Sequence, residues 1–175
     1  MRETTLEEAR LPSAKFDLAT AASSFHWIDE GIGLAHLASA LRPGGWLAMW
    51  WTLFGEDGAP DAFITATSPL LEGVASSPSG GAEGGPPHAL DRDARVAALA
   101  DAGFEAIEHE IVRWQTSWDT NGIRALYGTF SPIARLEESR RAEILAEIER
   151  IAREDFDGHV ERTLVTSLYT ARWPR

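Results

Sequence analysis

Residues 16–51 hold two apolar runs joined by a helix-like segment, and this pattern limits the fold more than any other feature of the chain. The first run, residues 16–23, combines small and apolar residues, as in a strand covered on both faces of a mostly parallel sheet. The second run, residues 46–51, is equally apolar. Between them, Asp29 is a favourable N-cap for an amphipathic helix, which we expect to end at residues 43–45, Pro-Gly-Gly.

This strand, helix and strand form a βαβ unit with two parallel strands. Such crossovers are almost always right-handed, and ligands of open α/β sheets bind outside the carboxyl ends of the strands. The sequence therefore predicts that any small-molecule site lies near residues 23–27 and 51–54.

The remainder of the chain continues the alternation of helices and strands. Hydrophobic periodicity and cap residues predict helices at residues 61–71, 91–102, 120–129 and 137–155. The second is expected to face inward with Val96, Leu99 and Ala100 and to end at Gly103. Thr120 and Asn121 are expected to cap the third, and the fourth has an apolar stripe of Ile144, Leu145, Ile148 and Ile151. Apolar and polar residues alternate in two further segments, which predicts strands at residues 106–114 and 160–173. The expected fold class is α/β.

The residues after the first strand carry a family resemblance. FDLATAASSFHWID, followed by LASALRPGGWLAMWW, resembles the fourth strand, the next helix and the fifth strand of class I S-adenosylmethionine-dependent methyltransferases of the type 11 kind. Residues 6–12, LEEARLP, resemble the acidic segment of that family that approaches adenine. The resemblance implies a partial Rossmann-like fold of three αβα layers, whose last strand runs antiparallel between the two strands before it.

The resemblance covers only the back part of the family's domain. The family's glycine-rich turn after its first strand, and the acidic residue that ends its second strand, match nothing here. Gly31 and Gly33 fall inside the predicted helix, and the glycines at 80–81 and 84–85 lie in a polar loop. We therefore expect half of the cofactor site to be absent from this chain.

The resemblance implies methyl transfer from S-adenosylmethionine to a small-molecule acceptor. It assigns His26 a catalytic role, because His26 follows the strand and could accept a proton or orient a substrate. It assigns cofactor binding to Glu8, Ala9, Ala22, Ser23 and Trp27. It assigns substrate binding to Phe25, Trp51 and Trp118.

Each assignment has a structural alternative. An isolated histidine is more often structural than catalytic. Phe25 and Trp27 could belong to the core, Trp118 could serve packing, and Glu8 could lie in a solvated turn. A metal site is not expected, because the chain has no cysteine and no pair of its five histidines has zinc-like spacing with a third ligand.

Composition restricts the classes of partner. The 175 residues suffice for one domain, predicted to span residues 1–175, and 44% of them are hydrophobic. The net charge is −11 and Lys15 is the only lysine, which argues against nucleic acid or an anionic membrane as partner. No segment reads as a leader or a membrane span, and the absence of cysteine is compatible with a cytoplasmic location.

Two segments interrupt this predicted domain. Residues 73–87 are rich in glycine, proline and serine, which predicts a flexible surface loop. Residues 119–156 correspond to the helical insertion that forms a lid over the acceptor in the resembling family.

Two alternatives to an active enzyme remain open. The chain could be a non-catalytic remnant that forms a homodimer through the unpaired edge of residues 16–23. Alternatively, the true start codon could lie upstream of Met1, so that the genuine enzyme begins earlier than this sequence. A glycine-rich strand, turn and helix encoded in frame upstream would favour the upstream start, and a nearby in-frame stop would favour the remnant.

Overall fold

The computed structural model describes residues 4–55, 61–74 and 85–175. Contacts among these residues divide the chain into two compact units. Unit 1 comprises Met1–Thr52, Pro78–Val112 and Thr166–Arg175, and unit 2 comprises Leu53–Ser77 and Arg113–Val165, each within the described ranges. Most of the loop predicted at residues 73–87, namely 75–84, lies outside the described residues.

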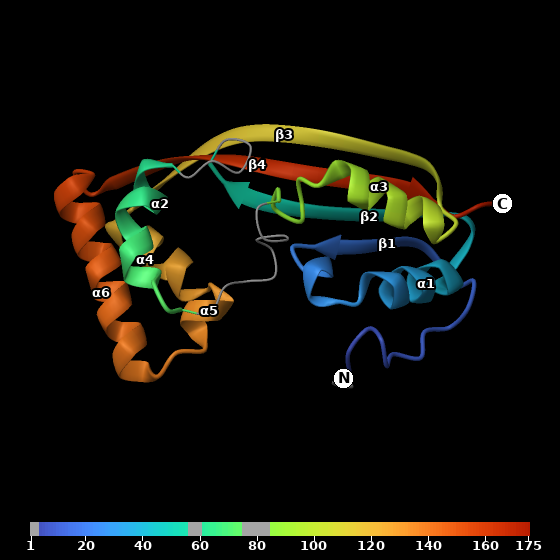
Figure 1. The fold of residues 1–175 in the computed structure, drawn as a ribbon, viewed down its shortest axis with the longest axis horizontal. Helices are drawn as coiled ribbons and strands as arrows, with labels where there is room; N and C mark the ends of the chain where they lie inside the picture. Colours follow the sequence, from blue (N-terminus) through green and yellow to red (C-terminus); the bar gives the residue numbers. More distant parts are fainter. Residues whose placement is uncertain (1–3, 56–60, 75–84) are drawn as a thin grey trace. The chain divides into compact units, whose positions relative to one another are not determined.

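The described strands form one sheet of four, in the order β1-β2-β4-β3 (Figure 1). They are β1 (Phe16–Ala22), β2 (Leu41–Phe54), β3 (Glu105–Asp119) and β4 (His159–Arg172). β1 and β2 are parallel, and the last strand, β4, is antiparallel and lies between β2 and β3. The α/β class and the position of the last strand, both predicted from the sequence, are confirmed.

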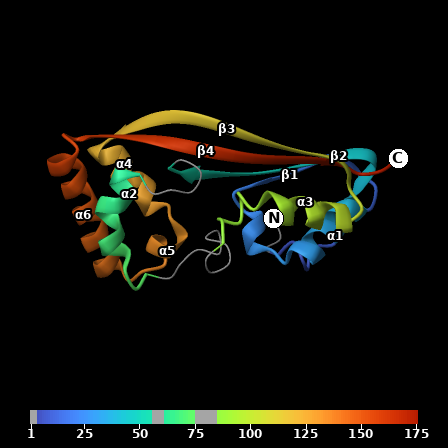
Figure 2. The same ribbon diagram turned by 45° about the horizontal axis from the view of Figure 1, so that its top comes forward.

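Helices occupy the segments between the strands. They are η1 (Phe25–Trp27), α1 (Glu30–Ala40), α2 (Ala62–Thr67), η2 (Ser68–Leu71), α3 (Arg92–Asp101), α4 (Thr120–Gly128), α5 (Ser131–Ala134) and α6 (Glu138–Asp155). The predicted helices are confirmed within a few residues, whereas η1 and α5 were not predicted. In unit 1, α1 and α3 lie on the same face of the sheet (Figure 2).

The junction between α1 and β2 differs from the prediction. The helix ends at Ala40 rather than at the Pro-Gly-Gly sequence, and β2 already begins at Leu41. Phe16 pairs with Leu41 but Leu18 pairs with Trp46, so the residues between form a bulge in β2. A Cβ at Gly45 would lie 2.9 Å from the Arg42 carbonyl oxygen, which explains why glycine occupies this bulge.

β1 lies at the edge of the sheet, as the expectation of an unpaired edge at residues 16–23 implies, but its faces are more exposed than its apolar pattern predicts. Its apolar run suggests a strand covered on both faces, yet five of its seven residues are exposed and the other two are half-buried. Leu18 is 54% exposed, Phe16 is 42% exposed, and Trp46, which pairs with Leu18, is 41% exposed. β1 is the edge of the sheet, so its apolar side chains have no neighbouring strand on one side.

Helix α3 was predicted with one wrong residue on its buried face. Leu99 is buried as expected, Val96 is half-buried, Ala100 is exposed, and Arg95 is buried instead. The predicted glycine at the end of this helix is confirmed, because Gly103 has a φ of +89° that other residues rarely adopt.

Unit 2 has a closed helical core. Ile144, Ile148 and Ile151 of α6 are buried as the sequence predicts, and Leu145 is half-buried. They pack with buried residues of the other elements of unit 2, namely Phe63, Ile123, Tyr127, Ile133 and Val160. Helix α4 is capped by the Asp119 side chain rather than by the predicted Thr120 and Asn121.

The burial pattern of β4 changes phase once along the strand. Val160, Arg162 and Leu164 are buried, and the next buried residue is Val165 rather than residue 166. Alternation on one side of this point therefore places Arg162 among apolar neighbours.

Candidate functional site

The chain turns sharply where β1 ends. Ser23 has a φ of +45°, a left-handed conformation that costs energy for a residue other than glycine. Its amide donates a hydrogen bond to the Trp50 carbonyl oxygen at 2.7 Å, which holds the turn against β2. The helical turn η1 follows and presents His26 and Trp27 just beyond the carboxyl end of the strand. Such strained turns often occur at binding sites.

A hydrogen bond joins His26 to the parallel strand β2. The Trp51 indole Nε1 donates to His26 Nδ1 at 2.9 Å. Because Nδ1 accepts this bond, the proton of the neutral imidazole resides on Nε2. Burial lowers the pKa of His26 from its ordinary value, which favours that neutral form. His26 can therefore donate a hydrogen bond from Nε2.

A second histidine lies beside this pair. The His88 ring is 5.3 Å from the Trp51 ring and 6.4 Å from the His26 ring, measured between centroids. Burial lowers the pKa of His88 to about 4, with smaller contributions from the charges of Arg95 and His26. Both imidazoles that flank the Trp51 indole thus favour the neutral form.

The segment that carries His88 is held firmly on the sheet. The carbonyl oxygen of Ala89 accepts hydrogen bonds from Ser167 Oγ at 2.7 Å and from Tyr169 Oη at 2.9 Å. The Tyr169 ring also packs edge-on against Trp51 at 6.1 Å. These contacts fix the position of the His88 backbone relative to β2.

A buried ion pair connects the two helices of unit 1. Arg95 Nη2 of α3 lies 3.1 Å from Glu30 Oε2 at the start of α1. Burial raises the pKa of Glu30, and the Arg95 charge opposes that rise. Arg95 Nε and Nη1, Glu30 Oε1 and His88 Nδ1 are buried without a hydrogen-bond partner among the described residues. Buried polar atoms of this kind are normally satisfied by water or by a ligand.

The predicted site residues of unit 1 separate into buried and exposed groups. Phe25 is 1% exposed and packs on Gly33, and Trp51 is 3% exposed. Trp27 is 44% exposed, and Ala22 and Ser23 are also exposed. The burial of Phe25 favours a packing role, whereas the Trp27 ring is accessible to a ligand.

The amino-terminal turn is attached to α1. Glu8 is exposed in this turn and Ala9 is half-buried. Glu7 Oε1 accepts a hydrogen bond from the Asp29 amide at 3.1 Å, and the amide hydrogen bonds around this carboxylate lower its pKa. His36 Nδ1 lies 2.9 Å from the Leu6 carbonyl oxygen. The Glu7 side chain therefore contacts the amino-terminal end of α1, whereas Glu8 was the residue predicted to bind the cofactor.

Trp118 belongs to unit 2, whereas the other predicted site residues belong to unit 1. Its ring packs edge-on against Phe54 at 6.3 Å, and it lies against the helical core of that unit. In the described part of the chain, no three His, Cys, Asp and Glu side chains are grouped to hold a metal ion. No helix in the described ranges is long and apolar enough to cross a membrane.

The sequence analysis did not predict the contacts of three polar residues. His88 directly follows the predicted flexible loop at residues 73–87, and no pattern in the sequence reveals its contact with Trp51. Arg95 was missed because the sequence pattern placed Val96 and Ala100, and not Arg95, on the buried face of its helix. Arg162 had a detectable signal, because alternation in the β4 segment places it on the same face as Val160 and Leu164.

Comparison with known proteins gives similarity at the level of the fold. No family model matches the sequence, and no curated protein matches it. A solved structure of a type II methyltransferase, described as putative, from Anaeromyxobacter dehalogenans matches 98% of this chain and 71% of its own, with 20% identity and a TM-score of 0.59. A methyltransferase from Bacillus halodurans C-125, also described as putative, matches 98% of this chain and 76% of its own, with 15% identity and a TM-score of 0.52.

The chain is shorter than these proteins. It spans 36% of phosphoethanolamine N-methyltransferase 2 from Haemonchus contortus, which matches 98% of this chain with 13% identity and a TM-score of 0.48. The match to the Anaeromyxobacter dehalogenans structure shows that the chain has part of a methyltransferase-like fold, as the resemblance in its sequence implies.

Proposed function

We propose that this chain forms part of a methyltransferase that uses S-adenosylmethionine to methylate a small molecule. The observation that carries the proposal is the arrangement of Ser23, His26, Trp27 and Trp51 at the carboxyl ends of β1 and β2. In open α/β sheets this is where ligands bind. The similarity to methyltransferase structures supports it, and the composition suits a cytoplasmic protein.

The exposed residues of this arrangement suit one part of the cofactor. Trp27 offers a partly exposed aromatic face on which an adenine or a sulfonium group could pack. Ala22 and Ser23 are exposed in the same turn, and Glu8 with Ala9 forms the acidic turn that we assign to the adenine side. S-adenosylmethionine, when bound, supplies an activated methyl group.

His26 acts in this proposal as a hydrogen-bond donor rather than as a base. Its Nδ1 is engaged by Trp51, so proton acceptance there would require loss of that 2.9 Å bond. Nε2 carries the proton and can orient an acceptor oxygen or nitrogen. Trp51 fixes the imidazole, while Phe25 supports η1 from the buried side. Trp118, in unit 2, keeps its proposed substrate-binding role as a separate assignment.

The experiment that tests this proposal is saturation-transfer NMR with S-adenosylhomocysteine and the 175-residue chain. This method detects binding in the millimolar range. We expect saturation to reach the adenine protons with the native chain and to fall strongly in Trp27→Ala. Trp46→Ala removes an equally exposed tryptophan of unit 1 and should leave the signal unchanged. Equal signals in the two variants would contradict the assignment.

A second function is supported by the exposed edge of the sheet. Phe16 and Leu18 of β1 leave apolar surface and backbone groups open, which is a common route to pairing with another strand. A non-catalytic chain could use this edge to form a homodimer. Sedimentation equilibrium at micromolar concentration would then show a dimer that Leu18→Lys dissociates. A stable monomer would rule out this alternative.

A further inference from the structure

The Trp51 indole packs against two other aromatic rings. The His88 ring meets it edge-on, with ring centres 5.3 Å apart and planes at 63°, and the Tyr169 ring does the same at 6.1 Å and 78°. Trp51 is 3% exposed, so its ring has little freedom to turn while both neighbours are in place. The direction of its Nε1–H group, which donates to His26 Nδ1, therefore depends on these two rings.

The backbone next to His88 is fixed by hydrogen bonds that begin on β3. The carbonyl oxygen of Ala89 can only accept, so the Ser167 hydroxyl, 2.7 Å away, donates to it. Ser167 has a single hydroxyl proton, and the 2.9 Å bond between its Oγ and His109 Nε2 must therefore be donated by His109. The Tyr169 hydroxyl donates a second bond to the same carbonyl oxygen at 2.9 Å. Two side chains of β4 thus hold Ala89, and one side chain of β3 orients the first of them.

These anchoring contacts are shielded from water. Ser167 and Tyr169 are both 0% exposed, and the His109 ring stacks on the Tyr169 ring with centres 4.3 Å apart. Water therefore competes little for their hydrogen bonds. His88 Nδ1, in contrast, is buried with no hydrogen-bond partner among the residues that the structure describes. The adjacent backbone and the packing against Trp51, rather than a bond to Nδ1, hold the His88 ring.

We propose that His88 is a positioning residue of the candidate site, which orients the Trp51 indole so that its Nε1–H group engages His26 Nδ1. While that bond is formed, the neutral His26 imidazole keeps its proton on Nε2, the atom from which it can donate to an acceptor. The inference rests on the proposed function for the use of that proton, but not for the contacts themselves. All of the residues involved belong to unit 1.

The titration of His26 reports whether the Trp51 indole is in place. Trp51 can donate to Nδ1 only when the imidazole is neutral, because the charged form carries a proton on that nitrogen. This bond acts in the same direction as burial, which lowers the pKa of His26. If the indole turns away, the pKa of His26 should therefore rise.

The charge of His88 does not disturb this measurement. The pKa of His88 is lowered to about 4, chiefly by burial, and the positive charges of Arg95 and His26 contribute to that value. His26 therefore takes up its proton before His88 does. Removal of His88 changes no neighbouring charge in the range where His26 titrates, so a change in the His26 titration reports a change in its contacts.

The test is NMR of the 175-residue chain with ¹⁵N-labelled histidine and tryptophan and no added ligand. A pH titration gives the pKa of His26, and solvent exchange of the Trp51 indole proton reports how often its hydrogen bond opens. In His88→Ala we expect the pKa of His26 to rise and indole exchange to accelerate about fivefold, the effect of one hydrogen bond of ordinary net strength. His88→Phe keeps a ring against Trp51 and should restore both quantities toward their native values.

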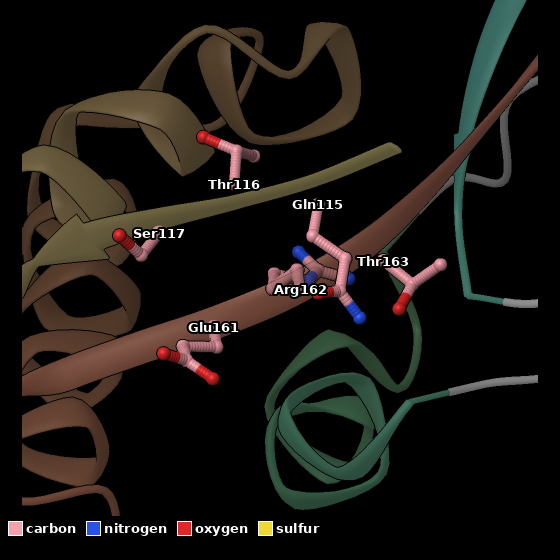
Figure 3. A pocket seen from close by; sticks show the side chains of 6 residues that line it. All are labelled: Gln115, Thr116, Ser117, Glu161, Arg162 and Thr163. Carbon is pink, nitrogen blue, oxygen red and sulfur yellow. The ribbon is translucent and has the colours of Figure 1, made fainter. Parts of the chain in front are cut away.

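A cavity in unit 2 supplies the control. It has a volume of about 390 Å³ and is lined by residues 115–117 of β3 and 161–163 of β4, none of which is a histidine or a tryptophan (Figure 3). Gln115→Ala changes an exposed side chain of β3, the strand that also carries His109. This variant should leave the pKa of His26 and the exchange of the Trp51 indole unchanged.

A double variant separates positioning from a change in solvation. Trp51→Phe removes the donor and should raise the pKa of His26 more than His88→Ala does. If His88 acts through Trp51, His88→Ala should add nothing further to that pKa in the Trp51→Phe chain. A rise of the same size in both backgrounds would mean that His88 acts on His26 by excluding water, and it would overturn the proposal.

Two further results would also overturn the proposal. One is native values of indole exchange and of the His26 pKa in His88→Ala. The other is a His88→Phe chain that behaves like His88→Ala, and this comparison remains decisive if Trp51→Phe does not fold. Neither measurement uses the cofactor. A chain that fails to bind S-adenosylhomocysteine would contradict the proposed function and leave these values unchanged.

Discussion

The two units differ in how completely they bury their apolar residues. In unit 2, α4 and α6 enclose isoleucines with 0–1% exposure, such as Ile123, Ile144 and Ile148. In unit 1, the edge strand β1 leaves Phe16 and Leu18 about half exposed. Unit 2 therefore covers its apolar residues with its own helices. The edge strand of unit 1 leaves apolar side chains exposed, and only another strand or surface would cover them. The strand beside the proposed site is therefore the exposed edge of the described sheet.

The largest change in the free energy of unfolding is expected when two helix N-cap residues are compared. Asp61 caps α2 and also pairs with buried Arg162, whereas Asp29 caps α1 without a buried partner. Asp61→Ala should cost about 3–5 kcal/mol for the unpaired arginine, in addition to about 1 kcal/mol for the cap. Asp29→Ala should cost about 1 kcal/mol. Urea unfolding measures both, and equal losses would show that the buried pair contributes little.

The next comparison concerns the core of unit 2 and the edge of unit 1. Ile148→Ala should lower the free energy of unfolding by about 2–5 kcal/mol, because Ile148 is 0% exposed. Leu18→Ala should change it by less than about 0.5 kcal/mol. Thermal or urea unfolding of both variants checks this. A loss of several kcal/mol in Leu18→Ala would mean that another chain covers the β1 edge.

The smallest effect concerns the pH dependence of unit 1. His88 has a pKa of about 4 in the folded chain, below the ordinary value of about 6.5. The unfolded chain therefore takes up the proton first, so this stabilisation is complete above about pH 6.5 and is lost as the pH falls toward 4. From pH 7 to pH 5 the loss should be about 2 kcal/mol, and the lowered pKa of His26 adds in the same direction.

A matched pair of variants isolates that contribution. His88→Gln should remove about 2 kcal/mol of the pH dependence between pH 7 and pH 5, as measured by urea unfolding. His159→Gln alters a histidine that is 57% exposed in unit 2 and should leave the dependence unchanged. If both variants follow the native curve, His88 does not have the lowered pKa.

Much of the fold could be predicted from the sequence because its signals are local. The helix caps Asp29 and Asp91 and the left-handed glycine Gly103 act on adjacent residues, and the isoleucine stripe of α6 follows the helical period. The start of β2 was misplaced because Pro-Gly-Gly usually ends a helix, whereas here it lies in a bulge that only pairing with β1 reveals.

The candidate site was less predictable because its contacts are distant in sequence. The position of His26 and Trp51 at two strand ends follows from the βαβ pattern, but their hydrogen bond does not. The contact of His88 with Trp51 depends on hydrogen bonds between Ala89 and β4 that no local pattern encodes. The exposure of β1 depends on its position at the sheet edge, which the family resemblance predicts but the apolar pattern of residues 16–23 does not.

Titration calorimetry of the 175-residue chain with S-adenosylhomocysteine measures whether its cofactor site is partial or complete. We infer that this chain supplies only part of a cofactor site, the part around Ser23 and Trp27. Each missing charged or backbone contact is worth about 1–3 kcal/mol, so affinity should fall by several tenfold steps relative to a complete site. We expect a dissociation constant no tighter than about 0.1 mM. Binding at micromolar concentration would contradict it and would indicate a complete site.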